Sequence, residues 1–370
     1  NLKTLSAYLL SDATMQAGNP FHLWRRTADK KGADIHAAVT AILTEHELAV
    51  AQGETNATAS PLVPISDQGT PLWMDHGQAF RPANQSQLAL DMGPPQFVPA
   101  DQLHSGVVAA RLEGSIRSPL FTLTHKNIHL HLKGTGVTVR LIIEGYYMDE
   151  FNALLFRGFK QDIKDVSTFS WRTLGSDVGR YVGHRGYIEV IDHGGGSIAI
   201  DQVRQSDGGP PPAGGGLSAL LLEPDQAETT HEDIAGAYAR WWENLPNRWS
   251  SGRQEPLDIQ LVNAMLSAGL LADKGSGQAL AESQQRYQEV ASSIPAPMKV
   301  LAIADGDGQD HPIYIRGNPH IHGDQAPRAF LAALSDPGRD GPHDRHGHEA
   351  RPDGRLVTLQ GLVRLLYLFL

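Results

Sequence analysis

The chain has 370 residues, contains no cysteine and carries a formal net charge of −10 at pH 7. A chain of this length can bury a sizeable core and is expected to form two or three domains. The lack of cysteine excludes disulfides, zinc–thiolate sites and haem attachment through a C-x-x-C-H motif. The acidic balance argues against a nucleic-acid partner, and no stretch is long and apolar enough to span a membrane.

Residues 1–60 are predicted to form a helical spacer segment. Apolar side chains recur there at helical spacing, first within 1–17 and again within 32–51. A Gly-Asn-Pro turn at 18–20 separates the two predicted helices.

Residues 62–207 are predicted to fold as one antiparallel β-sandwich. Apolar and polar side chains alternate with a period of two, typical of strands with one buried face, over 120–132, 137–143, 187–191 and 197–203. Glycine-containing stretches at 133–136 and 194–196 are predicted to be turns between these strands. No helix-length pattern intervenes, and we expect the first and last strands of the sandwich to meet.

A Gly/Pro-rich linker is predicted over 208–228, followed by a helical segment and the start of a C-terminal domain over 229–335. Thr230 is the predicted N-cap of the first helix, with Asp233 three residues on forming a poor capping box. Pro256 suits the first turn of the second helix. The last stretch, 336–370, is rich in Gly, His, Asp and Arg before a leucine run, and is expected to be a disordered or aberrant tail.

Several stretches of the predicted sandwich resemble the galactose-binding-like jelly-roll modules seen beside levanase-type glycoside hydrolases. The matching stretches are SPLFTL at 118–123, the D-V-x-x-Y-x-G run from 177 to 183, YIEVID at 187–192 and IAIDQV at 198–203. Two further stretches, 124–129 and 145–152, are similar to the version of this module in multi-domain cytochrome c family proteins of the planctomycete type.

This resemblance implies an α+β, multi-domain chain with a central galactose-binding-like jelly roll, flanked by helical segments. In that family the module lies between two domains of unknown function, and residues 300–331 resemble the opening of the C-terminal one. The chain is therefore expected to be a piece of a longer exported, periplasmic protein. Haem would belong only to domains absent from this chain, and the implied partners are a polysaccharide or other glycan and the other domains of the same polypeptide.

The candidate ligand site lies between the β-runs of the sandwich. Trp171 and Tyr181 are the candidate platform for a sugar ring, because the C–H faces of pyranoses pack on aromatic rings. Arg172, Asp177 and Arg185 are the candidate polar groups that would orient hydroxyls or hold an anionic substituent. The alternative is that the aromatic side chains belong to the core and the arginines to a solvated edge.

Further acids could act as acceptors for sugar hydroxyls or as ligands of a structural calcium ion: Glu189, Asp192 and Asp201. The resemblance favours the structural use for Asp201, which matches a position on the last strand of the module.

Two other patterns are candidate metal sites. His129 and His131 share one face of a predicted strand, although the same spacing also fits an ordinary polar strand face. Asp305, Asp307 and Asp310 lie in a stretch similar to a calcium loop. That stretch lacks the glycine and glutamate of an EF-hand, so a solvated turn is the alternative to calcium.

The sequence contains no nucleophile elbow, H-E-x-x-H motif, P-loop or dinucleotide-binding fingerprint. No pair of acids can be assigned the two roles that a glycosidase needs. We therefore expect a non-catalytic module that binds or positions a glycan for a larger exported protein. Two alternatives stay open: a structural spacer between domains, and part of an enzyme completed by sequence outside this chain.

Overall fold

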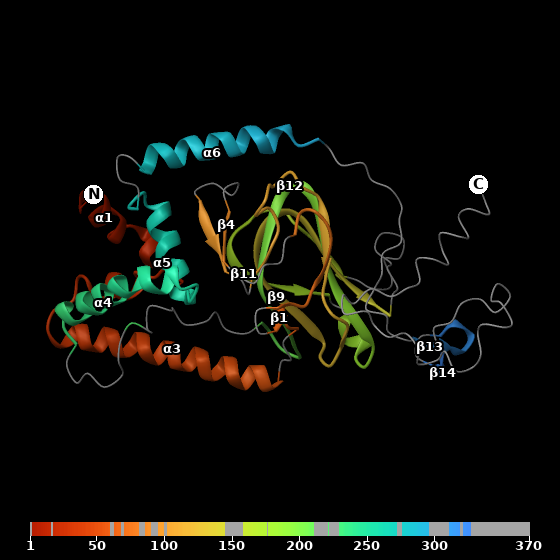
Figure 1. Ribbon diagram of the computed structural model, residues 1–370. Helices are drawn as coiled ribbons and strands as arrows, with labels where there is room; N and C mark the ends of the chain where they lie inside the picture. The colour runs from red at the N-terminus through yellow and green to blue at the C-terminus, as the bar shows by residue number, and fades with distance from the viewer. Residues whose placement is uncertain are drawn as a thin grey trace. The chain divides into compact units, whose positions relative to one another are not determined.

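The computed structural model describes residues 2–15, 18–59, 63–67, 70–80, 86–89, 95–99, 102–144, 158–175, 177–210, 221, 229–271, 276–295, 311–318 and 321–326. The chain divides into two compact units, Asn1–Val300 and Leu301–Leu370. The first unit holds the α-helices and a β-sandwich (Figure 1). In the second unit, β13 (His311–Tyr314) and β14 (His322–Ala326) pair as an antiparallel hairpin.

Helices from before and after the sandwich pack together in an apolar cluster formed by α2, α3 and α4. The helices of the first unit are α1 (Leu2–Leu9), α2 (His22–Thr27), α3 (Ala33–Ala59), α4 (His231–Ser250), α5 (Pro256–Ser267) and α6 (Ser276–Ser293). Ile234 of α4 is fully buried in a cluster with Leu23 of α2 and Val39 of α3. Because these residues lie about 200 positions apart in the sequence, the two predicted helical segments form one helical part.

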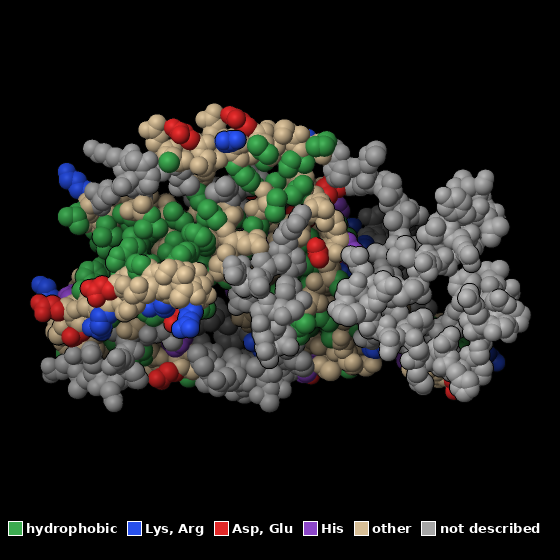
Figure 2. Space-filling model, viewed as in Figure 1, with side chains coloured by type: hydrophobic (Ala, Val, Ile, Leu, Met, Phe, Trp, Pro, Cys, Tyr) green, Lys and Arg blue, Asp and Glu red, His purple; other side chains and the backbone are tan. Residues whose placement is uncertain are grey.

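Apolar side chains also gather on a surface of the helical part (Figure 2). The exposed large apolar side chains of its helices include Leu2, Leu48, Trp242 and Val290. No helix in the described stretches is long and apolar enough to cross a membrane.

The predicted helix starts at Thr230 and Pro256 are confirmed. The Thr230 hydroxyl accepts from the backbone N–H of Asp233, and the Asp233 carboxylate accepts from the backbone N–H of Thr230. These reciprocal bonds satisfy backbone donors that a helix start leaves without intrahelical partners. Pro256 stands in the first turn of α5, where a missing N–H costs nothing.

Two long strands carry the β-sandwich, which the alternating pattern predicted correctly. Over the described residues, an eight-stranded antiparallel sheet runs in the order β10-β9-β12-β7-β3, while β11 pairs with β9, and β6 and β8 pair with β12. Its strands are β3 (Met74–Gly77), β6 (Leu103–His104), β7 (Gly114–Arg117), β8 (Phe121–Thr122), β9 (Asn127–Ile143), β10 (Lys160–Ile163), β11 (Val166–Leu174) and β12 (Arg185–Ser206). Two small hairpins join β1 (Ser66–Asp67) to β2 (Thr70–Pro71) and β4 (Gln87–Ala89) to β5 (Gln96–Val98).

The predicted turns at 133–136 and 194–196 are wrong. Each glycine stretch lies inside a single strand, β9 or β12. The pairing shifts register there: Val137 stands opposite Asp192 and Thr135 opposite Ser197, so residues 193–196 of β12 face Gly136 alone. The glycines allow this close crossing: a Cβ on Gly196 would lie 2.2 Å from the carbonyl oxygen of Thr135, and one on Gly134 would lie 2.5 Å from that of Ser197. The glycines therefore mark a shared bend in two paired strands.

The bend keeps both halves of β9 facing one core. Before it the β9 side chains of the core cluster are at even positions, and after it they are at odd positions: Ile128, Leu130, Leu132, Val137, Val139, Leu141 and Ile143. Since side chains alternate between faces with a period of two, one extra residue at the bend restores the inward direction. Near the two ends of the sandwich, the N–H of Val63 donates to the carbonyl of Val203 at 2.9 Å. The first strand of the large sheet, β3, pairs with β7, so the predicted meeting of the first and last strands is limited to this contact beside β12.

We predict that Gly196→Ala destabilises the protein by about 1–3 kcal/mol, the typical cost of forcing an extra carbon into a packed site. The added Cβ would meet backbone atoms, which cannot rotate away as a side chain can. Urea unfolding followed by circular dichroism measures the change. The control is Gly209→Ala, whose added Cβ would meet nothing within 4 Å; equal midpoints for the two variants would contradict the prediction.

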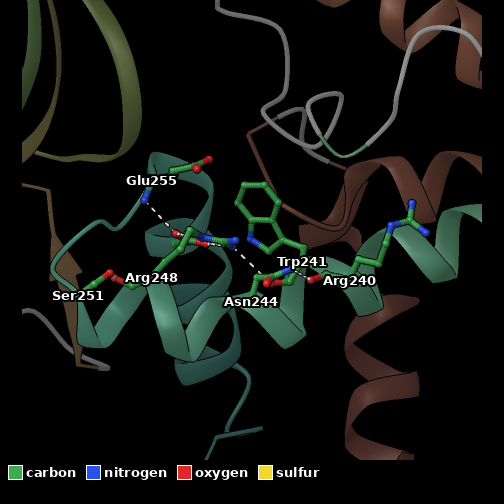
Figure 3. A network of polar contacts seen from close by, with 7 residues as sticks. Arg240, Trp241, Asn244, Arg248, Ser251 and Glu255 are labelled. Carbon is green, nitrogen blue, oxygen red and sulfur yellow. Dashed lines mark hydrogen bonds and ion pairs between the residues drawn. The ribbon is translucent and has the colours of Figure 1, made fainter.

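A buried ion pair joins α4 to α5 (Figure 3). Arg248 donates from Nε and Nη2 to the two carboxylate oxygens of Asp258, at 2.9 and 2.6 Å. Asp258 is fully buried, and its carboxylate also accepts from the backbone N–H of Glu255. The Arg248 guanidinium lies 4.2 Å from the ring centroid of Trp241. The bidentate bond and the stacked ring hold the turn between these helices in one geometry.

We expect Arg248→Met to destabilise the helical part by about 3–5 kcal/mol, because it leaves a fully buried carboxylate without its cation. Thermal unfolding followed at a helical wavelength measures the loss. Arg240→Met is the control, since Arg240 lies exposed on the same helix. Loss of the same size in both variants would show that the ion pair is unimportant.

Candidate functional site on the outer face of the sheet

The side of the sheet opposite the core carries a mixed aromatic and polar surface on β11, β9 and β12. We call it the outer face and define it by Phe169, Trp171, His131, Lys133, Asp201, Gln202 and Arg204. The antiparallel register sets these side chains in cross-strand rows, because directly opposed residues project to the same side. Trp171 stands opposite His131, which stands opposite Gln202, and Arg204 stands opposite His129 in a neighbouring row.

The centre of the outer face is formed by Trp171, His131 and Asp201. The centroid of the His131 ring lies 4.8 Å from that of Trp171 and 5.3 Å from that of Phe169. His131 Nδ1 lies 2.8 Å from a carboxylate oxygen of Asp201. The His131 and Asp201 side chains are 21% and 34% exposed, so this hydrogen-bonded pair is accessible from solvent.

A β-bulge explains why Asp201 reaches this surface. The register of β12 shifts between Ile200 and Gln202, so that two residues oppose one on β9. The extra residue lets Asp201 and Gln202 both remain partly exposed while Ile200 and Val203 on either side are buried.

Lys133 occupies the next row of the outer face. Its ammonium lies 5.2 Å from the centroid of the Phe169 ring and donates to the side-chain oxygen of Gln96 on β5 at 3.2 Å. Burial lowers the pKa of Lys133, while the nearby charge of Asp201 acts in the opposite direction. Ala199 on β12 stands opposite Lys133 on one side and opposite His104 of β6 on the other, so this row ends at His104.

His129 does not fit the metal site that its spacing allowed. Its two ring nitrogens lie 2.8 Å from the Thr173 hydroxyl and 2.7 Å from the Ser206 hydroxyl, and the ring is buried. His131 is held by Asp201 instead. Over the described residues, no cluster of three or more His, Cys, Asp or Glu side chains could hold a metal ion. The alternative, a polar strand face, is what the structure contains.

Among the predicted ligand-binding residues, Trp171 lies on the outer face and its neighbour Arg172 does not. Arg172 stands opposite Leu130, whose side chain is buried in the core, whereas Trp171 stands opposite His131. Successive residues of a strand project to opposite faces, so these two side chains cannot contact one sugar together.

Tyr181 was predicted to share the platform with Trp171, and the structure corrects this. The tyrosine is 8% exposed and packs in the core cluster, with its ring 5.7 Å from that of Phe159. It ends the short 3-10 helix Val178–Tyr181, whereas Trp171 lies on β11.

Asp177 and Arg185 also belong to a different part of the sandwich from Trp171. Asp177 is buried and lies 3.7 Å from Arg180. Arg185 begins β12, where its backbone N–H donates to the buried carboxylate of Glu144 at 2.9 Å. The five predicted residues therefore do not form one site.

The remaining predicted acids have structural partners or lie outside the described residues. Glu189 forms an ion pair with Arg140. Asp192 is buried, which raises its pKa, and accepts from the N–H of Gly194 at 2.8 Å within the bend. The predicted calcium ligands lie outside the described residues: Asp305, Asp307 and Asp310.

No protein-family model and no curated protein matches the sequence. Among solved structures, the chain is similar to the family 29 carbohydrate-binding module CBM29-2, at 13% identity and a TM-score of 0.26, over 42% of this chain and 91% of that one. A family 29 module from Piromyces equi matches at 15% identity and a TM-score of 0.24, over 40% and 89% of the two chains. A family two carbohydrate esterase from Cellvibrio japonicus matches at 11% identity and a TM-score of 0.24, over 42% of this chain and only 36% of the esterase.

The buried His104 makes the stability of the sandwich depend on pH. Burial, together with the charge of Lys133, lowers the pKa of His104 from 6.5 to about 4. His104 therefore takes up a proton near pH 6.5 in the unfolded chain but only near pH 4 in the folded chain. Stability should fall as the pH drops through this window, by at most about 3 kcal/mol from this group.

We expect His104→Leu to flatten this dependence, because an apolar side chain takes up no proton. Urea unfolding of wild type and variant at several pH values between 7 and 4 measures the difference between the two slopes. Parallel slopes for the two proteins would exclude His104 as the source of the pH dependence.

Proposed function

We propose that this chain is a non-catalytic module that binds a carbohydrate chain on its outer face. The observation that carries the proposal is the partly exposed ring of Trp171 beside the accessible His131–Asp201 pair. A sugar site needs an aromatic face for the C–H side of the ring and a few fixed polar groups for its hydroxyls. These groups meet on neighbouring strands of a rigid sheet.

The His131–Asp201 hydrogen bond supplies two fixed acceptors. An ionised carboxylate can only accept, so Nδ1 of a neutral His131 carries the proton and Nε2 is left as an acceptor. The second carboxylate oxygen of Asp201 is a further acceptor. A sugar ring stacked on Trp171 could donate hydroxyl protons to both atoms without either side chain having to reorganise.

The outer face favours binding over catalysis. Hydrolysis of a glycosidic bond requires two carboxyl groups on opposite sides of the bond. Asp201 is the only carboxylate among the residues that define this face. The accessible ring of Trp171 likewise favours binding over the spacer alternative, which predicts a sandwich covered on both sides. That the module serves a larger exported protein is part of the proposal, and it is supported by the sequence resemblance.

We predict that Trp171→Ala weakens carbohydrate binding by about 1–3 kcal/mol, the usual effect of removing an aromatic anchor. The fold should survive, because the ring is partly exposed and lies outside the core cluster. A glycan array probed with both proteins identifies ligands, and calorimetry on the best ligand gives the change in affinity.

The matched control is Tyr187→Ala, which removes another partly exposed aromatic ring from β12, stacked under Arg117. Its affinity should equal that of wild type. A wild-type protein that binds nothing on a broad array would refute the proposed function, and equal weakening by both substitutions would remove Trp171 as the anchor.

A further inference from the structure

The outer face carries two cations, Lys133 and Arg204, that form no ion pair with a carboxylate among the described residues. The polar partner of Lys133 there is the uncharged Gln96, and that of Arg204 is the uncharged Gln202, whose side-chain oxygen accepts from Nε at 3.1 Å. Neither cation lies within 4.0 Å of a described carboxylate oxygen, which distinguishes them from Arg140 and Arg248. Burial lowers the pKa values of both cations; the nearby charge of Asp201 acts in the opposite direction on Lys133, whereas burial is the cause for Arg204.

The two cations flank the aromatic centre of the outer face. Lys133 is one row from His131, and Arg204 is one row from it on the other side, opposite His129. At about 3.3 Å per residue, the rows of Lys133 and Arg204 lie roughly 13 Å apart along β9. That separation exceeds a single sugar ring, so a ligand touching both cations and Trp171 must be a chain.

We propose that the ligand is an acidic polysaccharide whose carboxylates, on sugars flanking the ring stacked on Trp171, pair with Lys133 and Arg204. This inference rests on the proposed carbohydrate-binding function and specifies its substrate class. A carboxylate would replace water around each cation with a charge-assisted hydrogen bond. Asp201 lies between them and is already engaged by His131, so it contacts the hydroxyls of the central sugar.

Local charge supports an anionic partner although the whole chain is acidic. The chain carries a net charge of −10, whereas the outer face contains Lys133 and Arg204 against Asp201 alone. His104, at the end of the Lys133 row, adds no charge at neutral pH because its pKa is about 4. Repulsion by the rest of the surface would then make binding depend on contact with these two side chains.

The test compares acidic polymers with their neutral counterparts. Polygalacturonate, alginate and hyaluronate would each be titrated as the native polymer and as its carboxyl-reduced form, at low and high salt. We expect wild type to bind at least one acidic polymer about tenfold more tightly than the reduced form, with a preference that salt weakens. Arg204→Gln and Lys133→Met should each reduce or abolish the preference for the acidic polymer over its reduced form.

Arg172→Gln is the matched control, since Arg172 is an exposed cation on the opposite side of β11 from Trp171. Its preference should equal that of wild type, and an equal loss in all three variants would show diffuse charge attraction and overturn the inference. Equal affinity for acidic and reduced polymers would also overturn it while the carbohydrate function stands. Binding of neither form, and of no glycan on the array, would overturn both.

Discussion

The antiparallel ladder between β9 and β12 is the constraint on which the sandwich depends. These strands pair from one end of β9 to the other, and the remaining strands of the large sheet are attached to one of them or to β7. The ladder can bend because backbone meets backbone at Gly134 and Gly196, where any Cβ would overlap a carbonyl oxygen of the partner strand. One core then serves both halves of each strand.

The arrangement of side chains on the outer face follows from the same β9–β12 ladder. Pairing fixes the rows, and the bulge after Ile200 turns Asp201 outward beside His131. A strand pair is stiff, so the aromatic ring and the polar groups are held in place before any ligand arrives, which reduces the ordering cost of binding. Lys133 and Arg204 are tolerated without an ion pair because they are only partly buried and can keep some water.

The helical part is stabilised by different interactions. Its core joins helices from both ends of the first unit, and its α4–α5 corner is held by a bidentate ion pair with a buried carboxylate. Removing Arg248 is therefore costly for a reason that the sandwich does not share. On β5, Phe97 exchanges two hydrogen bonds with Asn263 of α5 while the adjacent Gln96 bonds Lys133, so this short strand touches both parts.

The sequence by itself determined the local features of this protein: alternation located the sandwich strands, and short-range hydrogen-bond chemistry located the helix starts at Thr230 and Pro256. It also singled out Trp171.

Tertiary structure decided what depends on pairing between distant residues. The stretches around Gly134 and Gly196 have the glycine content of turns, and only the register of β9 against β12 shows that they form a bend. In the same way, the sequence grouped Arg172 and Tyr181 with Trp171. Strand alternation places Arg172 on the opposite face of β11, and Tyr181 is buried in the core. Lys133, Asp201 and Arg204 become members of one surface only when β9 and β12 lie side by side, because a ligand site on a sheet is assembled across strands and not along them.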